Sequence, residues 1–193
     1  MKSLRLLACF GALFVCFASR SARADDQPTP VVDHGPRFRF GVSATAGLIG
    51  QQQTYDNETQ WQSNIAVPGL AVRAGVQLDD RYAVFYQLSG SIFLPTLRNA
   101  AMFEVTPVRW FSVGAGASVN YFNPLDYDAS DAWSLGVPVR LAVNVPFHIS
   151  PTSGRRLGMS FNVEVTPAYS FGGPGLPAGF QLGSVAGVGF EMF

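Results

Sequence analysis

The sequence predicts an all-β protein: an eight-stranded antiparallel up-and-down transmembrane β-barrel that is preceded by a signal peptide. Three observations lead to this prediction. Hydrophobicity alternates with a period of two over eight segments, the segments are about 9 to 14 residues long, and the alternate face of each carries small or polar residues. Strands of soluble proteins average about 5–6 residues, whereas a tilted strand crossing a bilayer needs about 9–11.

The first 24 residues have the pattern of a secretory signal peptide. Lys2 and Arg5 form a basic start, residues 6–18 are apolar, and residues 22–24 read A-R-A, a cleavage motif. The apolar stretch is too short for a membrane-spanning helix. We therefore expect residues 1–24 to be removed, residues 25–35 to form a flexible periplasmic lead-in, and residues 36–193 to form the barrel.

Removal of the leader changes the chemistry of the chain. The alternatives to removal are a retained N-terminal anchor and a lipid anchor on Cys9, but Cys9 comes too early in the apolar stretch and Cys16 follows Val15 rather than a small residue. Without the leader the chain has no cysteine and no lysine, and nine arginines face 13 acidic residues, a net charge of −4. This balance predicts no nucleic-acid partner.

The first four segments, 37–48, 70–78, 81–94 and 100–107, each have one apolar row. Gly, Ser, Thr, Gln or charged residues alternate with these rows, as expected for a strand between two different environments. The apolar rows are Phe38, Phe40, Val42, Ala44, Ala46 and Leu48; Leu70, Val72, Ala74, Val76 and Leu78; Tyr82, Val84, Tyr86, Leu88, Ile92 and Leu94; and Ala101, Phe103 and Val105.

The second four segments, 111–121, 133–145, 157–165 and 180–192, repeat the pattern. Their alternate faces are again dominated by Gly, Ser and Asn with isolated charges. The apolar rows are Phe111, Val113, Ala115, Ala117, Val119 and Tyr121; Trp133, Leu135, Val137, Val139, Leu141, Val143 and Val145; Leu157, Met159, Phe161, Val163 and Val165; and Phe180, Leu182, Ala186, Val188, Phe190 and Met192.

The apolar rows carry no charge, so we expect them to face lipid and the other rows to face the barrel interior. A water-facing surface would be rich in Lys and Glu, whereas small residues suit the interior of a narrow barrel. Glu191 also falls on this polar face. Interior charges need partners, and an interior polar plug is predicted, with an open pore as the alternative. We expect Arg140 opposite Asn162, with Glu164 diagonal. The predicted plug residues are Arg39, Arg73, Glu104, Arg140 and Glu164.

The connections predict which end faces outward. Residues 78–81 (LDDR) and 106–111 (TPVRWF) are expected to form short inner turns, whereas 147–156 is long for one. The predicted outer loops are 51–63, 95–99, 122–131 and 168–179. Aromatic residues fall where interfacial girdles are expected: Tyr82, Trp110 and Phe147 at the inner end, and Trp61, Tyr121 and Trp133 at the outer end.

The signal peptide, the strand pattern and the last residues, VAGVGFEMF, together resemble small eight-stranded bacterial outer-membrane β-barrel proteins. The resemblance implies a location in the bacterial outer membrane and contact with outer-membrane lipids. It also implies that Phe193 is part of an assembly signal read by the barrel-assembly machinery. In the proteins that it resembles, the terminal Phe continues the outward row, whereas strict alternation puts Phe193 on the inner face. We therefore expect either a bulge near Gly187 or Gly189, or a bend of the last residue beyond the strand.

Sequence motifs give little support for catalysis or metal binding. The pair His148 and Ser150 has the spacing found in outer-membrane lipid A deacylases, but His148 falls at the inner end, and a turn histidine is favoured. His34 lies in the lead-in. The acidic stretch DYDASD, residues 126–131, lacks a complete calcium-ligand spacing. No catalytic residue, cofactor or metal site is therefore predicted.

The leading functional hypothesis is a non-enzymatic outer-membrane barrel with a structural or surface-interaction role. Its outer loops could bind an extracellular ligand, whose chemistry the sequence does not indicate. The alternative is a narrow, porin-like channel or carrier for small or hydrophobic molecules. A lipid-modifying enzyme comes third, and a soluble periplasmic β-barrel that binds a ligand is a rival at the level of the fold.

Overall fold

The computed structural model describes residues 35–55, 58–91, 96–122, 132–150, 155–172 and 178–192, with side chains at all of these positions except 53–60 and 62–67. Several predicted features lie outside these ranges: the signal peptide, all of the lead-in except Gly35, His34, the DYDASD stretch and Phe193.

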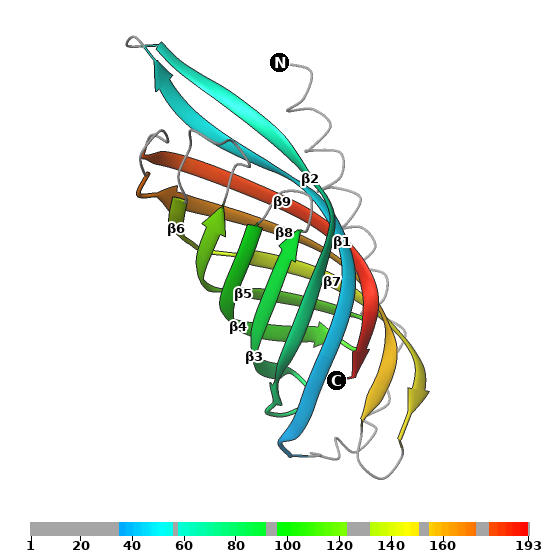
Figure 1. Ribbon diagram of the computed structural model, residues 1–193. Coiled ribbons are helices and arrows are strands. Elements are labelled where there is room, and N and C mark those ends of the chain that lie inside the picture. The colour runs from blue at the N-terminus through cyan, green and yellow to red at the C-terminus, as the bar shows by residue number, and fades with distance from the viewer. Residues whose placement is uncertain are drawn as a thin grey trace. The chain divides into compact units, whose positions relative to one another are not determined.

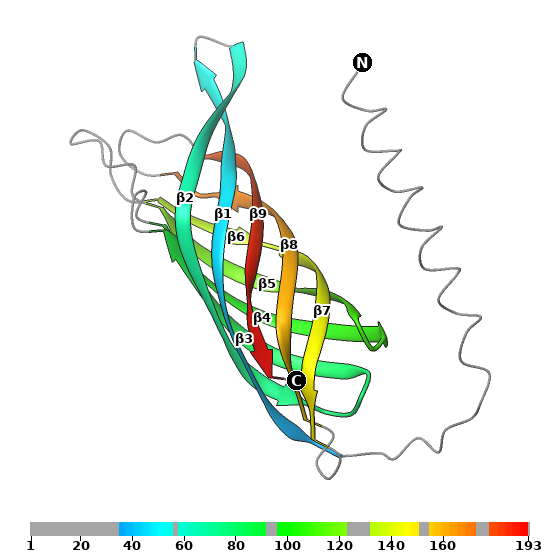
Figure 2. The ribbon, with the colours of Figure 1, turned by 90° about the vertical axis from the view of Figure 1, so that its right-hand side faces the viewer.

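Residues 37–192 form one antiparallel sheet that closes on itself (Figures 1 and 2). Consecutive strands pair along the chain, except that β6 and β7 each pair with β5 and β8. β1 pairs with β9 from Phe40↔Met192 to Gln51↔Gln181, so that the ring has no free edge. The strands are β1 (Arg37–Tyr55), β2 (Glu58–Gln77), β3 (Tyr82–Ser91), β4 (Thr96–Val108), β5 (Phe111–Phe122), β6 (Ala132–Gly136), β7 (Val139–Ile149), β8 (Arg156–Ser170) and β9 (Gly179–Met192).

Strands β6 and β7 follow one another end to end and together fill one strand position of the barrel, between β5 and β8. Both pair with β5 on one side and with β8 on the other. The ladder is interrupted at Pro138, which has no N–H to donate. Hydrogen bonds continue around the break, because Val137 N–H donates to the carbonyl of Pro167 (2.9 Å) and Gly116 N–H donates to the carbonyl of Pro138 (3.1 Å). The predicted eight-stranded antiparallel barrel is confirmed.

The two faces of the sheet are oriented as the alternation predicts. In β3 and β8, exposed and buried residues alternate almost without interruption, and the exposed ones are the predicted apolar rows. Leu70 is 55% exposed and Phe190 is 58% exposed, whereas Arg140 and Glu104 are both fully buried. Apolar side chains therefore cover the outside of the barrel, and charged side chains fill the inside.

The predicted outer loop at 51–63 is wrong. β1 continues to Tyr55 and β2 begins at Glu58, and their ladder runs without a gap from Gln51↔Gln62 to Tyr55↔Glu58. In Figure 1 this hairpin extends beyond the neighbouring strands. The prediction used the loss of apolar alternation as the end of the strand, but backbone pairing continues through Gln and Thr once the chain has left the apolar zone.

Strand β4 also begins earlier than predicted. Residues 95–99 were expected to be a loop, but β4 starts at Thr96, which pairs with Ser91. As a result, Arg98 belongs to the wall of the barrel. The predicted loop at 168–179 likewise starts too early, because β8 continues to Ser170.

The two short inner turns are confirmed. β4 and β5 are joined by only residues 109 and 110. Between β2 and β3, the Asp79 side chain accepts hydrogen bonds from the backbone N–H groups of Arg81 (2.6 Å) and Tyr82 (2.7 Å), which closes the turn.

Of the two alternatives predicted for the end of the chain, the bulge near Gly187 or Gly189 is wrong, and the bend at Phe193 lies outside the described residues. The ladders of β9 with β1 and with β8 keep one register from end to end. Inward and outward residues therefore alternate regularly as far as Met192.

The narrow interior explains why small residues dominate the inner face. A Cβ atom added to Gly189 would lie 2.0 Å from the carbonyl oxygen of Val42 and 2.5 Å from the Cα atom of Ser43. On the same inner face of the same strand, a Cβ atom added to Gly183 would meet only ordinary contacts at 3.8 Å. The wall is therefore tightly packed near the inner end of β9 and looser near its outer end.

We predict that Gly189→Ala destabilises the barrel by about 1–3 kcal/mol, because the new methyl group has no space without a backbone shift. Gly183→Ala is the matched control and should be close to neutral. Equilibrium unfolding of both variants in the same detergent or bilayer measures the difference. Equal stability of the two variants would contradict this account of the packing.

Candidate functional site

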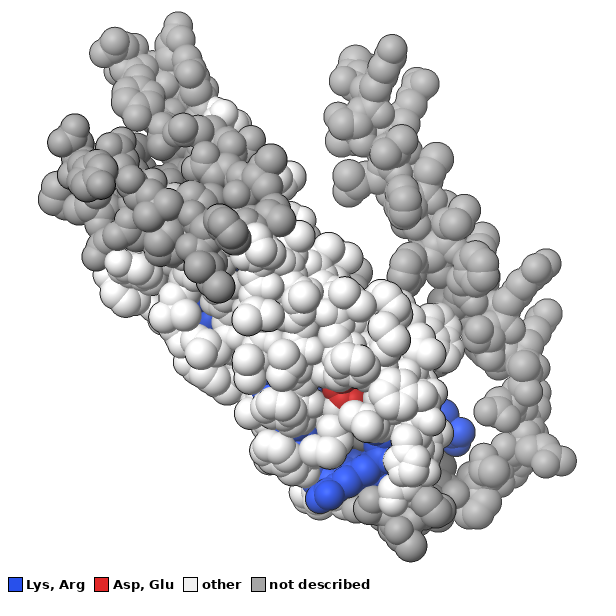
Figure 3. Space-filling model, turned by 45° about the vertical axis from the view of Figure 1, so that its right-hand side comes forward, with Lys and Arg blue, Asp and Glu red and all other residues white. Residues whose placement is uncertain are grey.

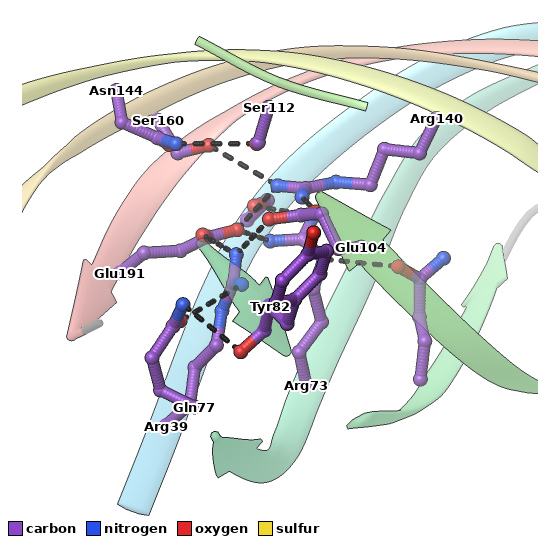
Figure 4. A network of polar contacts seen from close by, with 12 residues as sticks. Arg39, Arg73, Gln77, Tyr82, Glu104, Ser112, Arg140, Asn144, Ser160 and Glu191 are labelled. Atoms are coloured by element: carbon purple, nitrogen blue, oxygen red, sulfur yellow. Dashed lines mark hydrogen bonds and ion pairs between the residues drawn. The ribbon is translucent and has the colours of Figure 1, made fainter. Parts of the chain in front are cut away.

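Three arginines and two glutamates form a single ion-paired cluster in the interior of the barrel (Figure 4). Arg39 Nη2 donates to Glu104 Oε1 at 2.6 Å and to Glu191 Oε2 at 2.9 Å. Arg73 Nη1 donates to Glu191 Oε1 at 2.5 Å. The Arg140 guanidinium pairs with both carboxylates. We call these five residues the central cluster.

The central cluster joins distant parts of the wall. Its members come from β1, β2, β4, β7 and β9, and no side chain among them is more than 2% exposed. Ion pairs therefore cross the interior from one side of the barrel to the other. Charged hydrogen bonds of this kind are stronger in a dehydrated site than at a surface.

The central cluster continues towards the outer end through Gln87. Arg73 Nε donates to Gln87 Oε1 (2.9 Å), and Gln87 Nε2 donates to Glu164 Oε2 (2.8 Å). Glu164 in turn forms an ion pair with Arg98 (2.6 Å), which also donates to the hydroxyl of Thr166 (2.7 Å). The interior is thus crossed by one continuous polar network with two layers of charge.

An apolar wall closes one side of the central cluster. Phe85 points inward from β3 and packs with Ala100 and Met102, all at most 2% exposed. The guanidinium carbons of Arg39 and Arg140 lie 5.1 and 5.9 Å from the centre of the Phe85 ring. These contacts are short enough for cation–π attraction and keep water away from the ion pairs.

Above the Arg98–Glu164 pair, towards the outer end, the interior is hollow. A cavity of about 100 Å³ lies there, with Arg98, Ser89 and Thr166 among its lining residues. Thr45, Asn120, Ser134 and Gln181 line it further out, together with apolar side chains. The barrel therefore has a filled inner half and a small hollow in its outer half.

The structure places all five predicted plug residues inside the barrel, but their pairing differs from the prediction. Arg140 lies opposite Glu164 in the β7–β8 ladder, and Asn162 lies opposite Ala142. Nevertheless, Arg140 forms ion pairs with residues of β4 and β9, and Glu164 pairs with Arg98. The register depends on the β7–β8 connection and on a shift between Pro146 and His148, which alternation alone does not reveal.

Sequence reasoning missed three important members of the network. Glu191 was placed on the inner face but was not assigned to the plug, although it contacts all three central arginines. Gln87 was also on the inner face, and its bridging role required knowledge of the strand order. Arg98 was lost because its segment was taken for a loop.

The described residues show no cluster for metal binding. No group of three or more His, Cys, Asp or Glu side chains within them could hold a metal ion. His148 is exposed near the inner end of β7, opposite Leu157. Within the described part of the chain, no helix is long and apolar enough to cross a membrane.

The central cluster has three positive and two negative groups, so removal of a glutamate should lower the free energy of unfolding more than removal of an arginine. We predict that Glu191→Gln costs about 3–5 kcal/mol, because it leaves three buried guanidinium groups facing one carboxylate. Arg73→Gln should cost clearly less, because two arginines then face two glutamates. Unfolding free energies of both variants test this, and a larger loss for Arg73→Gln would contradict the charge count.

Comparisons with known proteins give only distant likenesses. No protein-family model matches the sequence, and no curated protein gives a significant match. The outer membrane protein OprG from Pseudomonas aeruginosa aligns with 12% identity over 82% of this chain and 97% of its own, with a TM-score of 0.32. Ail, the attachment invasion locus protein of Yersinia pestis, solved with the heparin analogue sucrose octasulfate, aligns with 9% identity over 79% of this chain and 98% of its own, with a TM-score of 0.24.

These values are too low to carry an argument, so the conclusion comes from the geometry. The sheet is closed by its first and last strands, its outer face is apolar, and its interior is held by buried ion pairs. Lipid imposes this inverted arrangement, because it leaves neither backbone groups nor outward side chains a polar partner. The chain therefore has the architecture of the small outer-membrane β-barrel proteins.

Proposed function

We propose that this protein is a closed, non-enzymatic barrel of the bacterial outer membrane with a structural or surface-interaction role. The observation that carries the proposal is the continuous polar network, which fills the inner half of the barrel from wall to wall. A barrel of eight strands has an interior only wide enough for side chains or one small ligand. With that space occupied by ion pairs, the simplest role lies at the membrane surface and not in bulk transport.

The outer surface supports the membrane location. Apolar side chains exposed by 36% or more occur on every strand of the ring, and aromatic residues lie near both ends. At the outer end, the rings of Tyr121 and Trp133 are 5.2 Å apart; nearer the inner end, Phe147 and Phe190 are 6.3 Å apart. So much exposed apolar surface is unfavourable in water and speaks against the soluble periplasmic binder.

The second candidate function is a narrow carrier or channel for small molecules. The outer cavity favours it, since about 100 Å³ is room for a small ligand. A passage through the barrel would still require the central cluster to move. A lipid-modifying enzyme has less support, because His148 is exposed at the end opposite to the one expected of such a site.

The membrane location predicts that a charged substitution on the outer face destabilises the barrel, whereas an apolar substitution there does not. Val139 is 41% exposed near the middle of the strand position that β6 and β7 fill together. We expect Val139→Arg to reduce the stability of the bilayer-inserted barrel by about 2–4 kcal/mol, because the charge must enter hydrocarbon. Val139→Leu is the control and should be near neutral. A Val139→Arg protein that folds and stays soluble without detergent or lipid would refute the membrane location.

The closed interior predicts that the barrel does not conduct ions. Planar bilayer recordings of the refolded wild-type protein should show no steady open pore, because the ion pairs of the central cluster occupy the interior. The variant Arg73→Ala/Glu191→Ala removes one charge of each sign and should introduce a small leak while preserving the strand content seen by circular dichroism. Large, steady wild-type pores would instead support the channel function.

A further inference from the structure

The nine arginines of the described residues are divided between the interior and the inner rim. Four are interior residues, and five lie where strands begin or turn at the inner end: Arg37, Arg81, Arg109, Arg155 and Arg156. Figure 3 shows the largest area of arginine side chains (blue) towards one end of the described barrel. We call these five residues the rim arginines.

The rim arginines outnumber the described acidic residues at the inner end, which are Asp79 and Asp80. Asp80 accepts an ion pair from Arg37 at 2.6 Å and lies 3.9 Å from Arg156, so two guanidinium groups share one carboxylate. The other described acid at this end, Asp79, uses its side chain to close the β2–β3 turn. No ion pair is formed between the exposed side chains of Arg81, Arg109 or Arg155 and a described carboxylate.

Arg37 adds positive charge at the inner mouth of the barrel, where it lies on the same inner face of β1 as Arg39. Its side chain is only 6% exposed, and its Nε and Nη1 atoms have no hydrogen-bond partner among the described residues. Arg37 and Arg156 lie close together, because both reach Asp80. The inner end therefore carries an excess of positive charge, and an oxyanion is the group that best satisfies the guanidinium donors that are exposed there.

The neighbours of the rim arginines favour a lipid over a soluble anion. Arg81 is followed by Tyr82 (40% exposed), and Arg156 is followed by Leu157 (42% exposed). Arg109 is followed by Trp110. Each arginine thus lies where the apolar outer surface ends, which is the level of the lipid headgroups, with aromatic residues at the same level. A soluble anion would need no such apolar surface beside it.

We propose that the three exposed rim arginines, Arg81, Arg109 and Arg155, form a binding site for the headgroups of anionic phospholipids in the inner leaflet. The proposal rests on the membrane location proposed above. Binding would set the depth of the barrel in the membrane through phosphate–guanidinium contacts, while the acyl chains cover the apolar wall beside them.

The test uses the full mature barrel refolded into phosphatidylcholine vesicles that contain a minor fraction of phosphatidylglycerol. Spin-labelled phosphatidylglycerol and spin-labelled phosphatidylcholine report, in separate samples, the fraction of each lipid immobilised on the protein. We expect phosphatidylglycerol to be preferred by about fivefold, the ratio that corresponds to about 1 kcal/mol for one arginine at an anionic surface. No preference would overturn the site.

Variants separate charge from packing. The triple variant R81Q/R109Q/R155Q changes only exposed side chains, so it should fold and lose most of the preference. The matched control R81K/R109K/R155K keeps the charges and should retain most of it. If the glutamine variant kept the full preference, these arginines would not form the site.

Two further readings distinguish the remaining outcomes. Inorganic phosphate, compared with chloride at equal ionic strength, should not abolish the preference; if it did, the rim would be a site for soluble oxyanions. Failure of the wild-type protein to insert into pure phosphatidylcholine vesicles would count against the membrane location itself. Normal insertion without a lipid preference would overturn only the lipid site.

Discussion

Buried charge is the constraint around which the interior of this barrel is organised. Arg39, Arg73 and Arg140 are tolerable inside only because Glu104 and Glu191 accept from all three of them. The small residues of the inner face make room for this arrangement. A Cβ atom on Gly41, for example, would lie 2.7 Å from Cγ of Glu191. Loss of space beside the cluster and loss of a partner within it therefore disturb the same interactions.

The closed ring and the charged interior depend on each other. Pairing of β1 with β9 leaves no edge of the sheet to be satisfied by solvent, which permits an apolar surface all around the outside. The polar side chains are then confined to the inside, where they can reach only one another. Ion pairs across the interior, such as those from β1 and β7 to β4, join strands that are not neighbours in the ring.

The barrel has two different ends and two different halves. Ion pairs fill the inner half, whereas the outer half contains a cavity above Arg98 and Glu164. At the inner end, arginines outnumber the described carboxylates and stand beside the end of the apolar surface. The inner half is therefore filled and charged, whereas the outer half is partly hollow.

The sequence by itself determined the period-two alternation, the number of strand positions in the ring and the assignment of apolar rows to the outside, because each depends only on which residues are adjacent in the chain. It also identified most of the buried charges. Only the tertiary structure decided their partners: Arg140 faces Glu164 across a ladder yet pairs with Glu104 and Glu191. The extent of the β1–β2 hairpin and the place of Arg98 in the wall were likewise hidden, since polar residues can continue a ladder as well as end one. The physical reason is that contacts across a closed ring depend on register and on the bending of long side chains, and both are fixed only when the first strand meets the last.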